Sequence, residues 1–187
     1  MRAFDAAVLG QLPQGSAQAA AVVLWSCARL RHHPGEALFL AAADRQLAIQ
    51  PGQLAPLSLA LTAWAAGVLE VRGARGRLWA LLEAHAQLVG SYGPSDASLV
   101  LWALARLRMM PPPGWLAAVF SHTQPQLAAF PPRELANLVW GLAQLPDYAP
   151  PAGWRGDLAG RWQAGDLTGR DRITVRRALQ RWNKRRV

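Results

Sequence analysis

The chain has 187 residues and a single cysteine, Cys27, which excludes an internal disulfide and a thiolate metal cage. Its formal net charge of +9 is uneven, because residues 1–149 carry 10 basic against 8 acidic side chains and residues 150–187 carry 10 against 3. Such a basic end favours a polyanion as partner, nucleic acid being the commonest in a cell; the alternative is a solvated end that keeps the chain soluble.

Helical segments with a tryptophan at a regular interval dominate the sequence. Trp25, Trp64, Trp102 and Trp140 follow one another at intervals of 39, 38 and 38 residues, and leucine follows each of them five residues later. The apolar positions shared around each tryptophan fall on one broad side of a helix, which predicts amphipathic helices with a wide buried face. In chain order these helices are predicted at residues 18–31, 57–71, 95–108 and 133–145.

A second set of helical segments alternates with the first, and most members carry an aromatic residue of their own, Phe39, Trp79, Trp115 or Trp154. Clusters of proline and glycine, best formed at residues 111–114, separate the units. These helices are predicted at residues 2–12, 36–49, 78–89 and 114–129. Signals for β-strands are nearly absent, with no Asn-Gly or Asp-Gly hairpin turn.

A single hairpin of about 38 residues cannot bury both of its apolar faces, so neighbouring hairpins must stack. The sequence therefore predicts an all-α fold, an α-solenoid of stacked antiparallel helical hairpins that forms one domain over residues 1–187. The predicted repeats are 1–33 (partial), 34–72, 73–110, 111–149 and 150–187. The last repeat is degenerate and basic, as expected of a terminal unit with no neighbour on one side.

Tryptophans in regular register are predicted to belong to the structural core, because a repeated apolar residue marks the surface where hairpins meet. This prediction covers Trp25, Trp64, Trp79, Trp102, Trp115, Trp140 and Trp154. Trp162 and Trp182 are flanked by arginines and are the better candidates for stacking on bases. Cys27 lies two residues after Trp25, where the other units have Ala or Leu, and is predicted to be a small core residue.

The uncharged run at residues 46–69 is long enough to raise the question of a membrane span. Pro51, Gly52 and Pro56 interrupt it, so a turn followed by a helix of the array is predicted and no membrane partner is expected. The first residues lack the apolar core of a signal peptide and the Arg- and Ser-rich character of a transit peptide. A targeting segment is therefore expected to be missing from this chain or not to exist.

Nothing in the sequence predicts catalytic chemistry, a cofactor, a metal or a small-molecule substrate. His32 and His33 are adjacent and cannot face one site from the same side of a helix, so they are predicted to be turn residues. His85 and His122 lie in different units without a nucleophile or carboxylate at a catalytic spacing. The chain is therefore predicted not to be an enzyme.

Two segments of the fourth unit carry a family resemblance. Residues 111–115, Pro-Pro-Pro-Gly-Trp, are followed at residues 135–140 by Leu-Ala-Asn-Leu-Val-Trp. This pattern resembles the octotricopeptide repeat (OPR) family, although Gly114 stands where that family has glutamate. The resemblance implies a helical-repeat protein of the chloroplast, or alternatively the mitochondrion, that binds single-stranded RNA and affects transcript stability, processing or translation. It also implies protein partners in an organellar RNA-processing or translation complex.

The tryptophan helices also have a stripe of variable positions, seven and three before the tryptophan and one and four after it. Fixed geometry with variable chemistry is what repeat proteins use to contact one base per repeat. The stripe residues predicted to contact RNA are Arg29, Arg106, Arg133, Asn137 and Gln144. Arg31 and Arg108 at the helix ends are predicted to contact phosphate, and the basic end adds Arg176, Arg177, Arg181 and Lys184 as RNA-binding residues.

The same stripe is open to another interpretation. Every amphipathic helix has a solvated side, and Leu57, Leu61 and Val68 of the second unit cannot recognise a base edge by hydrogen bonding. The alternative function is a protein–protein interaction scaffold built on the same α-solenoid. Because four or five repeats would meet only about as many bases, the chain is expected to be a fragment or to act with a partner or a second copy.

Overall fold

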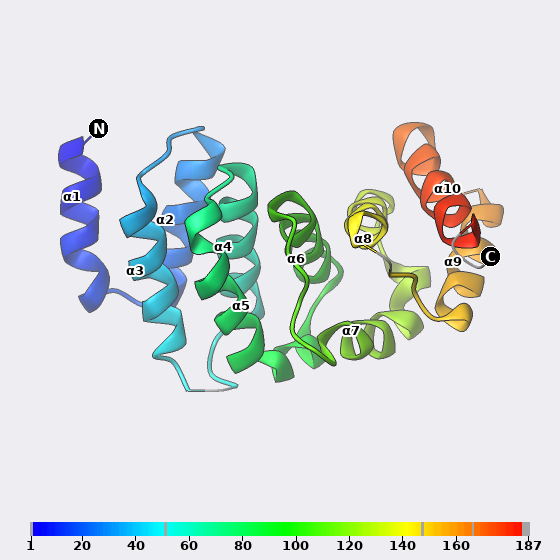
Figure 1. The fold of residues 1–187 in the computed structure, drawn as a ribbon, viewed down its shortest axis with the longest axis horizontal. Helices are drawn as coiled ribbons and strands as arrows, with labels where there is room; N and C mark the ends of the chain where they lie inside the picture. The colour runs from blue at the N-terminus through cyan, green and yellow to red at the C-terminus, as the bar shows by residue number, and fades with distance from the viewer. Residues whose placement is uncertain (1, 51, 147, 166, 185–187) are drawn as a thin grey trace.

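The computed structural model describes residues 2–50, 52–146, 148–165 and 167–184, and within these ranges the chain is helical with no strand. Figure 1 shows the helices following one another in an elongated array, with the two termini toward opposite ends. Successive helices alternate between two layers, and each layer stacks along the array. The predicted all-α fold is confirmed: the chain is an α-solenoid of stacked hairpins.

One layer, the inner layer, consists of helices that lie side by side in chain order. Its members are α2 (Ala17–Arg29), α4 (Pro56–Val68), α6 (Pro94–Leu107), α8 (Pro132–Gln144) and α10 (Gly169–Lys184). Proline begins α4, α6 and α8, where its missing N–H costs no helical hydrogen bond. At the start of α2, the Ser16 hydroxyl oxygen accepts a hydrogen bond of 3.0 Å from the Ala19 N–H.

The outer layer consists of helices and of the 3-10 turns that precede or follow some of them. Its helices are α1 (Arg2–Gln11), α3 (Glu36–Leu47), α5 (Arg75–Ala84), α7 (Trp115–Thr123) and α9 (Ala152–Ala164), and its 3-10 turns are η1 (Leu12–Gln14), η2 (Arg72–Ala74), η3 (Ala86–Ser91) and η4 (Gln124–Ala129). The turn η3 packs against α7, and η4 packs against α9. At α7 and α9 the contact with the preceding outer unit runs through a 3-10 turn, whereas consecutive inner helices touch directly along the whole layer, so the inner layer follows the shorter arc and forms the concave side.

Two outer helices end earlier than predicted. The helices predicted at 78–89 and 114–129 end at Ala84 and Thr123, and the chain continues in each case as a 3-10 turn. Pro125 explains the second case, because it has no N–H to donate to the helical hydrogen-bond pattern. Each of the predicted spans 34–72, 73–110, 111–149 and 150–187 contains one outer and one inner helix.

The core lies between the layers, and aromatic side chains meet in its C-terminal part. Trp115 and Trp154 are 2 % and 0 % exposed. The ring centroids of Trp154 and Phe120 are 5.4 Å apart in an edge-on contact, and the Trp154 indole N–H donates a hydrogen bond of 3.1 Å to the Thr123 hydroxyl. Trp182, predicted as a candidate for base stacking, is instead fully buried, with its ring edge-on to Trp154 at 6.3 Å.

The inner helices approach one another closely where their side chains are small. A Cβ atom on Gly141 of α8 would lie 2.7 Å from backbone atoms of Leu101 in α6. A Cβ atom on Gly67 of α4 would lie 3.0 Å from the Cα of Ala103 in α6. Neighbouring inner helices therefore touch backbone to backbone at these points. This close contact determines which positions of each helix are buried against its neighbour.

The structure corrects the core assignment of the inner-layer tryptophans. Trp25 is 37 % exposed, and Trp64, Trp102 and Trp140 are half-buried at the margin of the core. Each central inner helix has a neighbouring inner helix on both sides and the outer layer behind it. The tryptophan column lies between the two lateral contacts and faces the concave side, so these indoles are only partly covered.

Trp79 of α5 requires a second correction. It is 37 % exposed, whereas the preceding residue, Leu78, is 2 % exposed and occupies the core position. The helix α5 buries Leu78, Leu81 and Leu82, and a residue one step after Leu78 is rotated by about 100° away from it. Trp79 therefore lies on the surface of the outer layer.

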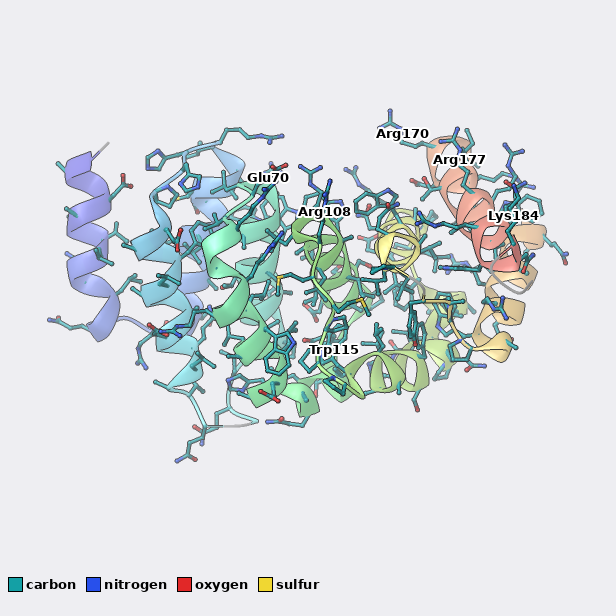
Figure 2. The ribbon with its side chains drawn as sticks, in the orientation of Figure 1. Glu70, Arg108, Trp115, Arg170, Arg177 and Lys184 are labelled. Carbon is teal, nitrogen blue, oxygen red and sulfur yellow. The ribbon has the colours of Figure 1, made fainter. Side chains whose placement is uncertain are left out.

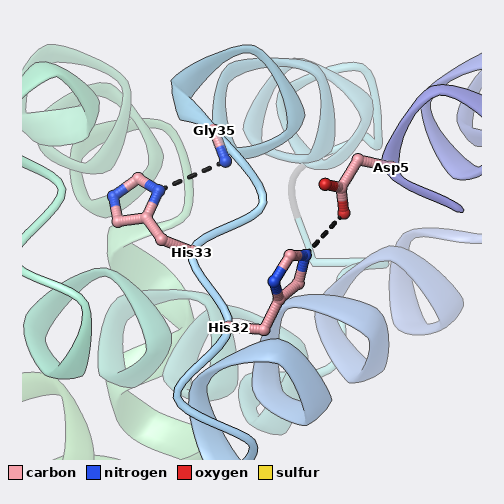
Figure 3. A network of polar contacts seen from close by, with 4 residues as sticks. All are labelled: Asp5, His32, His33 and Gly35. Carbon is pink, nitrogen blue, oxygen red and sulfur yellow. Dashed lines mark hydrogen bonds and ion pairs between the residues drawn. The ribbon is translucent and has the colours of Figure 1, made fainter. Parts of the chain in front are cut away.

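The connection between α2 and α3 contains the two adjacent histidines, which are turn residues as predicted. Figure 3 shows them directed to different partners: His32 Nε2 lies 2.7 Å from the Asp5 carboxylate of α1, and His33 Nδ1 accepts a hydrogen bond of 3.2 Å from the Gly35 N–H.

Within the described ranges, no group of three or more His, Cys, Asp or Glu side chains could hold a metal ion. Cys27 is buried, and desolvation raises the pKa of its thiol, which keeps it protonated.

The uncharged run at residues 46–69 forms the end of α3, the connection that follows it and α4. None of the described helices combines the length and the apolar character that a membrane span needs.

Candidate nucleic-acid interface

On the solvent-facing side of the inner layer, three of the four predicted stripe positions are accessible to solvent and the fourth is mostly buried. Positions seven and three before the tryptophan, and four after it, are exposed or half-buried in α2, α4, α6 and α8. The position one after the tryptophan is buried in three of these helices, at Ala65, Ala103 and Gly141. Ala103 and Gly141 lie against the neighbouring inner helix. The tryptophans themselves are accessible instead, so half-exposed indoles lie among the variable positions of the stripe.

The inner tryptophans form a row across four helices, and arginines lie over two of them. The ring centroids of Trp102 and Trp140 are 6.4 Å apart, with the ring planes inclined by 34°. The guanidinium of Arg29 lies 5.6 Å from the Trp25 ring centroid, and that of Arg106 lies 5.8 Å from the Trp102 ring centroid. Each arginine is four residues after its tryptophan, on the same side of the helix, and the cation–π attraction contributes about 0.5–1 kcal/mol at such exposed sites.

The helices α2, α4 and α6 end alike, with a charged residue six positions after the tryptophan. Arg31, Glu70 and Arg108 have φ values of 56°, 53° and 53°, the left-handed conformation that glycine adopts most easily. The residue after each donates its N–H to the carbonyl five residues earlier at 2.9 to 3.0 Å. Figure 2 shows Glu70 and Arg108 along the same margin of the molecule as Arg170 and Arg177. Charged side chains therefore follow one edge of the inner layer.

A pocket of about 330 Å³ lies at the C-terminal ends of α2, α4 and α6. We call it the Trp64 pocket; its lining residues are Ala28, Arg29, Arg31, Trp64, Val68, Trp102 and Arg106. Three predicted RNA-binding residues, Arg29, Arg31 and Arg106, thus come together beside two indoles that the sequence assigned to the core. Arg106 also forms an ion pair of 2.5 Å with Glu70.

A second hollow, which we call the groove, lies between α8 and α10 and has a volume of about 450 Å³. Trp140 and Gln144 line it from α8, and Arg170, Arg177 and Arg181 line it from α10. The buried residues Val175, Ala178 and Trp182 seat α10 against the rest of the array, which directs these arginines toward α8. The predicted residues Gln144, Arg177 and Arg181 are therefore brought together. Arg170, which lies about two helical turns before Arg177, also lines this groove, although the sequence did not single it out.

The other predicted RNA-binding residues lie outside both hollows. Arg133 and Asn137 belong to the first half of α8, exposed and half-buried respectively, on the concave side. Arg108 is exposed at the end of α6, and Arg176 and Lys184 are exposed on α10. These positions extend a basic surface without forming a pocket.

Trp162 of α9, the other tryptophan predicted to be available for stacking, already contacts a cation. The guanidinium of Arg172 lies 4.7 Å from its ring centroid and donates a hydrogen bond of 3.3 Å to the Trp162 carbonyl oxygen. Its indole is half-buried and ties α9 to α10. The structure thus gives Trp162 a packing role.

The chain matches a family model over most of its length. Residues 4–153, from α1 to the start of α9, match the family model described as the Tbc2 translation factor, N-terminal domain. This range includes the row of half-exposed tryptophans and the whole Trp64 pocket. No curated protein and no solved structure matches the chain.

Proposed function

The chain belongs to the family of the Tbc2 translation factor, N-terminal domain, and from this premise we propose that it binds single-stranded RNA through the concave side of its inner layer. It acts in the stability, processing or translation of organellar transcripts and performs no chemistry on them. Its partners are the RNA and proteins of an organellar RNA-processing or translation complex.

The observation that carries this proposal is the combination of cations and flat aromatic surface on one side of the array. Arg29, Arg31 and Arg106 surround the Trp64 pocket, and Arg177 and Arg181 line the groove beside Trp140. Phosphates attract the arginines through charge and hydrogen bonding, and unpaired bases present flat π surfaces that suit indole rings. Single-stranded nucleic acid is the polymer that offers both features at every residue.

Family membership and the repeats support two further proposals, one on the repeat family and one on the cellular compartment. We propose that the chain is an octotricopeptide repeat protein, supported by stacked helix pairs at an interval of about 38 residues and by the motif at residues 111–115. We further propose the chloroplast as its compartment, with the mitochondrion as the alternative. The translation-factor family is compatible with either organelle.

Direct binding is the experiment that tests the proposal. Labelled mixed-sequence single-stranded RNA of about 12 nucleotides should bind the full chain at about 50 mM salt, measured by fluorescence anisotropy. If about four phosphates are contacted, raising the salt to about 200 mM should lower the affinity about 50-fold. Absence of binding at the lower salt concentration would contradict the proposal.

A pair of arginine variants locates the interface. Arg177→Gln removes a groove cation and should reduce the slope of log affinity against log salt by about 0.7, the value of one single-strand phosphate contact. Arg77→Gln removes an exposed arginine of the outer layer, where Arg77 pairs with Asp44 at 2.6 Å, and should leave the slope unchanged. Equal effects of the two substitutions would assign binding to net charge alone.

A protein–protein interaction scaffold is the second candidate function. The observation in its favour is the exposed apolar surface on the first two inner helices, where Val22 and Leu57 are 43 % and 48 % exposed. Such residues suit an apolar protein partner better than a base edge. Substituting Leu57 with Gln distinguishes the two functions, because it should weaken a protein complex and leave RNA affinity unchanged.

A further inference from the structure

The tryptophan row is not uniform, because two of its members, Trp64 and Trp140, have no arginine of their own helix over the ring. Four residues after Trp25 and Trp102 stand Arg29 and Arg106, each within 6 Å of the ring centroid. Four residues after Trp64 stands Val68, an uncharged side chain. The indole of Trp64 therefore lines the pocket without a cation supplied by its own helix, and the cations come from the helices on either side.

The charges around Trp64 are arranged on two sides of the pocket. Arg29 and Arg31 come from the end of α2, and Arg106 comes from α6. Among the described carboxylates, Glu70 pairs with Arg106 at 2.5 Å, while none forms an ion pair with Arg29 or Arg31. The two α2 arginines thus keep their charge available for a ligand, and Arg106 must share its charge with Glu70.

The helix ends place further charges beside the pocket. Arg31 and Glu70 adopt the left-handed conformation, as Arg108 does at the end of α6, so this conformation belongs to the way in which these helices end. At the ends of α2 and α4 it places opposite charges near one pocket, with Arg31 in the lining and Glu70 paired with Arg106.

We propose that the Trp64 pocket is a nucleotide-binding subsite, in which the indoles of Trp64 and Trp102 stack on a base and Arg29 and Arg31 contact the adjoining phosphate. Glu70 opposes the binding of phosphate there by holding Arg106. The inference rests on the proposed function and goes beyond it, because it gives the tryptophans a ligand-contacting role and gives Glu70 a restraining one.

Single-stranded RNA fits this pocket better than an acidic peptide does. Carboxylates would engage the arginines and leave the two indoles exposed to water. A nucleotide covers both kinds of surface at once, since its base is a flat π system adjacent to a charged phosphate. A volume of about 330 Å³ is at the lower end of the range for small-ligand sites, as expected of a subsite for one unit of a longer polymer.

The test compares indoles of the two layers. Trp64→Leu keeps an apolar side chain and removes the π surface, and it should lower affinity for the single-stranded RNA at least about fivefold, the lower limit for one stacked base. Trp64→Phe keeps a stacking surface and should recover most of the affinity. Trp79→Leu, at the exposed indole of the outer layer, is the matched control and should bind as the unaltered chain does.

A change in the RNA provides a test that does not depend on the folding of any variant. RNA of the same length with abasic residues keeps every phosphate and removes every stacking surface. The unaltered chain should bind it about 5- to 150-fold more weakly than intact RNA for each base that is stacked. Equal affinity for intact and abasic RNA would overturn the subsite while leaving RNA binding itself in place.

The failure of the inference and the failure of the proposed function are distinguishable. Binding of intact RNA that is unaffected by Trp64→Leu overturns the subsite alone, whereas no binding of intact RNA at low salt overturns both. Polyglutamate of similar length serves as the acidic-peptide probe. Its binding in the absence of RNA binding would assign the pocket to protein partners.

A substitution of Glu70 should change the RNA affinity in the opposite direction from a substitution of Trp64. Glu70→Gln releases Arg106 from its ion pair and removes a negative charge at the rim, so it should raise affinity for RNA and steepen its salt dependence. Glu83→Gln changes the net charge equally at an exposed position of α5 and serves as the control. Equal changes in affinity from both substitutions, or a decrease from Glu70→Gln, would overturn the restraining role of Glu70.

Discussion

The tryptophans of the core and the tryptophans of the inner row belong to the same repeats and yet occupy opposite environments. Trp115 and Trp154 are enclosed between the layers, where their rings contact other aromatic side chains. Trp25 is more than one-third exposed, and Trp64 lines a pocket with three arginines. Regular recurrence therefore marks a structurally equivalent position, and the environment of that position depends on which sides the neighbouring helices cover.

The largest expected difference between the two sets is in stability. Trp154→Ala should lower the free energy of unfolding by about 3–5 kcal/mol, because it removes a fully buried indole and its hydrogen bond to Thr123. Trp140→Ala removes a half-buried ring and should cost clearly less than that. Urea unfolding followed by circular dichroism measures both, and equal losses would contradict the distinction.

The close contact between inner helices gives the next largest effect. Gly141→Ala places a Cβ atom 2.7 Å from the backbone of Leu101 and should destabilise the chain by about 1–3 kcal/mol by forcing α6 and α8 apart. Gly160→Ala is the control, because Gly160 lies in the helix α9 with no atom within 4 Å of the added methyl group. That substitution should stabilise the chain by about 0.5–1 kcal/mol through helix propensity. A neutral Gly141→Ala variant would show that the inner layer tolerates wider spacing.

Two tryptophans of equal exposure sharpen the comparison between layers. Trp25 and Trp79 are each 37 % exposed, so replacing either with leucine should change stability by a similar, small amount. Only Trp25→Leu should weaken RNA binding, by about fivefold if Trp25 stacks on one base. Anisotropy titrations of the two variants under the same salt conditions make the measurement. Equal RNA affinities for the two would remove Trp25 from the interface.

The smallest effect concerns a buried titratable group of the outer layer. His85 is 1 % exposed, and desolvation lowers the pKa of its imidazole below the ordinary value of 6.5. The unfolded chain therefore binds a proton at a higher pH than the folded chain, so stability is complete above about pH 6.5 and falls as the pH decreases below it. His85→Leu should flatten this part of the stability profile. An unchanged slope below pH 6.5 would assign the dependence to other groups.

The fold could be predicted from the sequence because its signals are local and repeated. Proline at the first position of α4, α6 and α8, together with apolar residues at helical spacing, locates these helices within a few residues. The early end of α7 is marked in the sequence by Pro125, whereas no proline marks the end of α5, where the turn η3 follows.

The burial of the inner tryptophans was mispredicted although the geometry was present in the sequence. On a helix turning 100° per residue, the six shared apolar positions centre about 115° from the tryptophan, whereas the variable stripe centres only about 55° from it. Because large apolar side chains are usually buried, the sequence predicts these tryptophans in the core despite this angle. The closeness of Gly141 to Leu101, which buries the column one residue after the tryptophan, depends on contact between helices 40 residues apart and is not visible in either helix alone.

Some site residues could be found from sequence and others only from the structure. Arg29, Arg106 and Gln144 lie on the predicted stripe, and the structure places them in hollows. The convergence of Arg31 with Arg106, and the restraint of Arg106 by Glu70, depend on how the end of one helix meets the next. The contribution of Arg170 to the groove likewise follows from the angle at which α10 packs on α8.

Photo-crosslinking tests most directly whether the concave side of the inner layer is the RNA-binding surface. RNA containing 4-thiouridine, irradiated in complex with the full chain and analysed by peptide mass spectrometry, should crosslink to α2, α4, α6 and α8 near Trp25, Trp64, Trp102 and Trp140. The peptide of α5 that contains the equally exposed Trp79 should remain unmodified. Crosslinks on α5 as abundant as those on the inner helices would contradict the account.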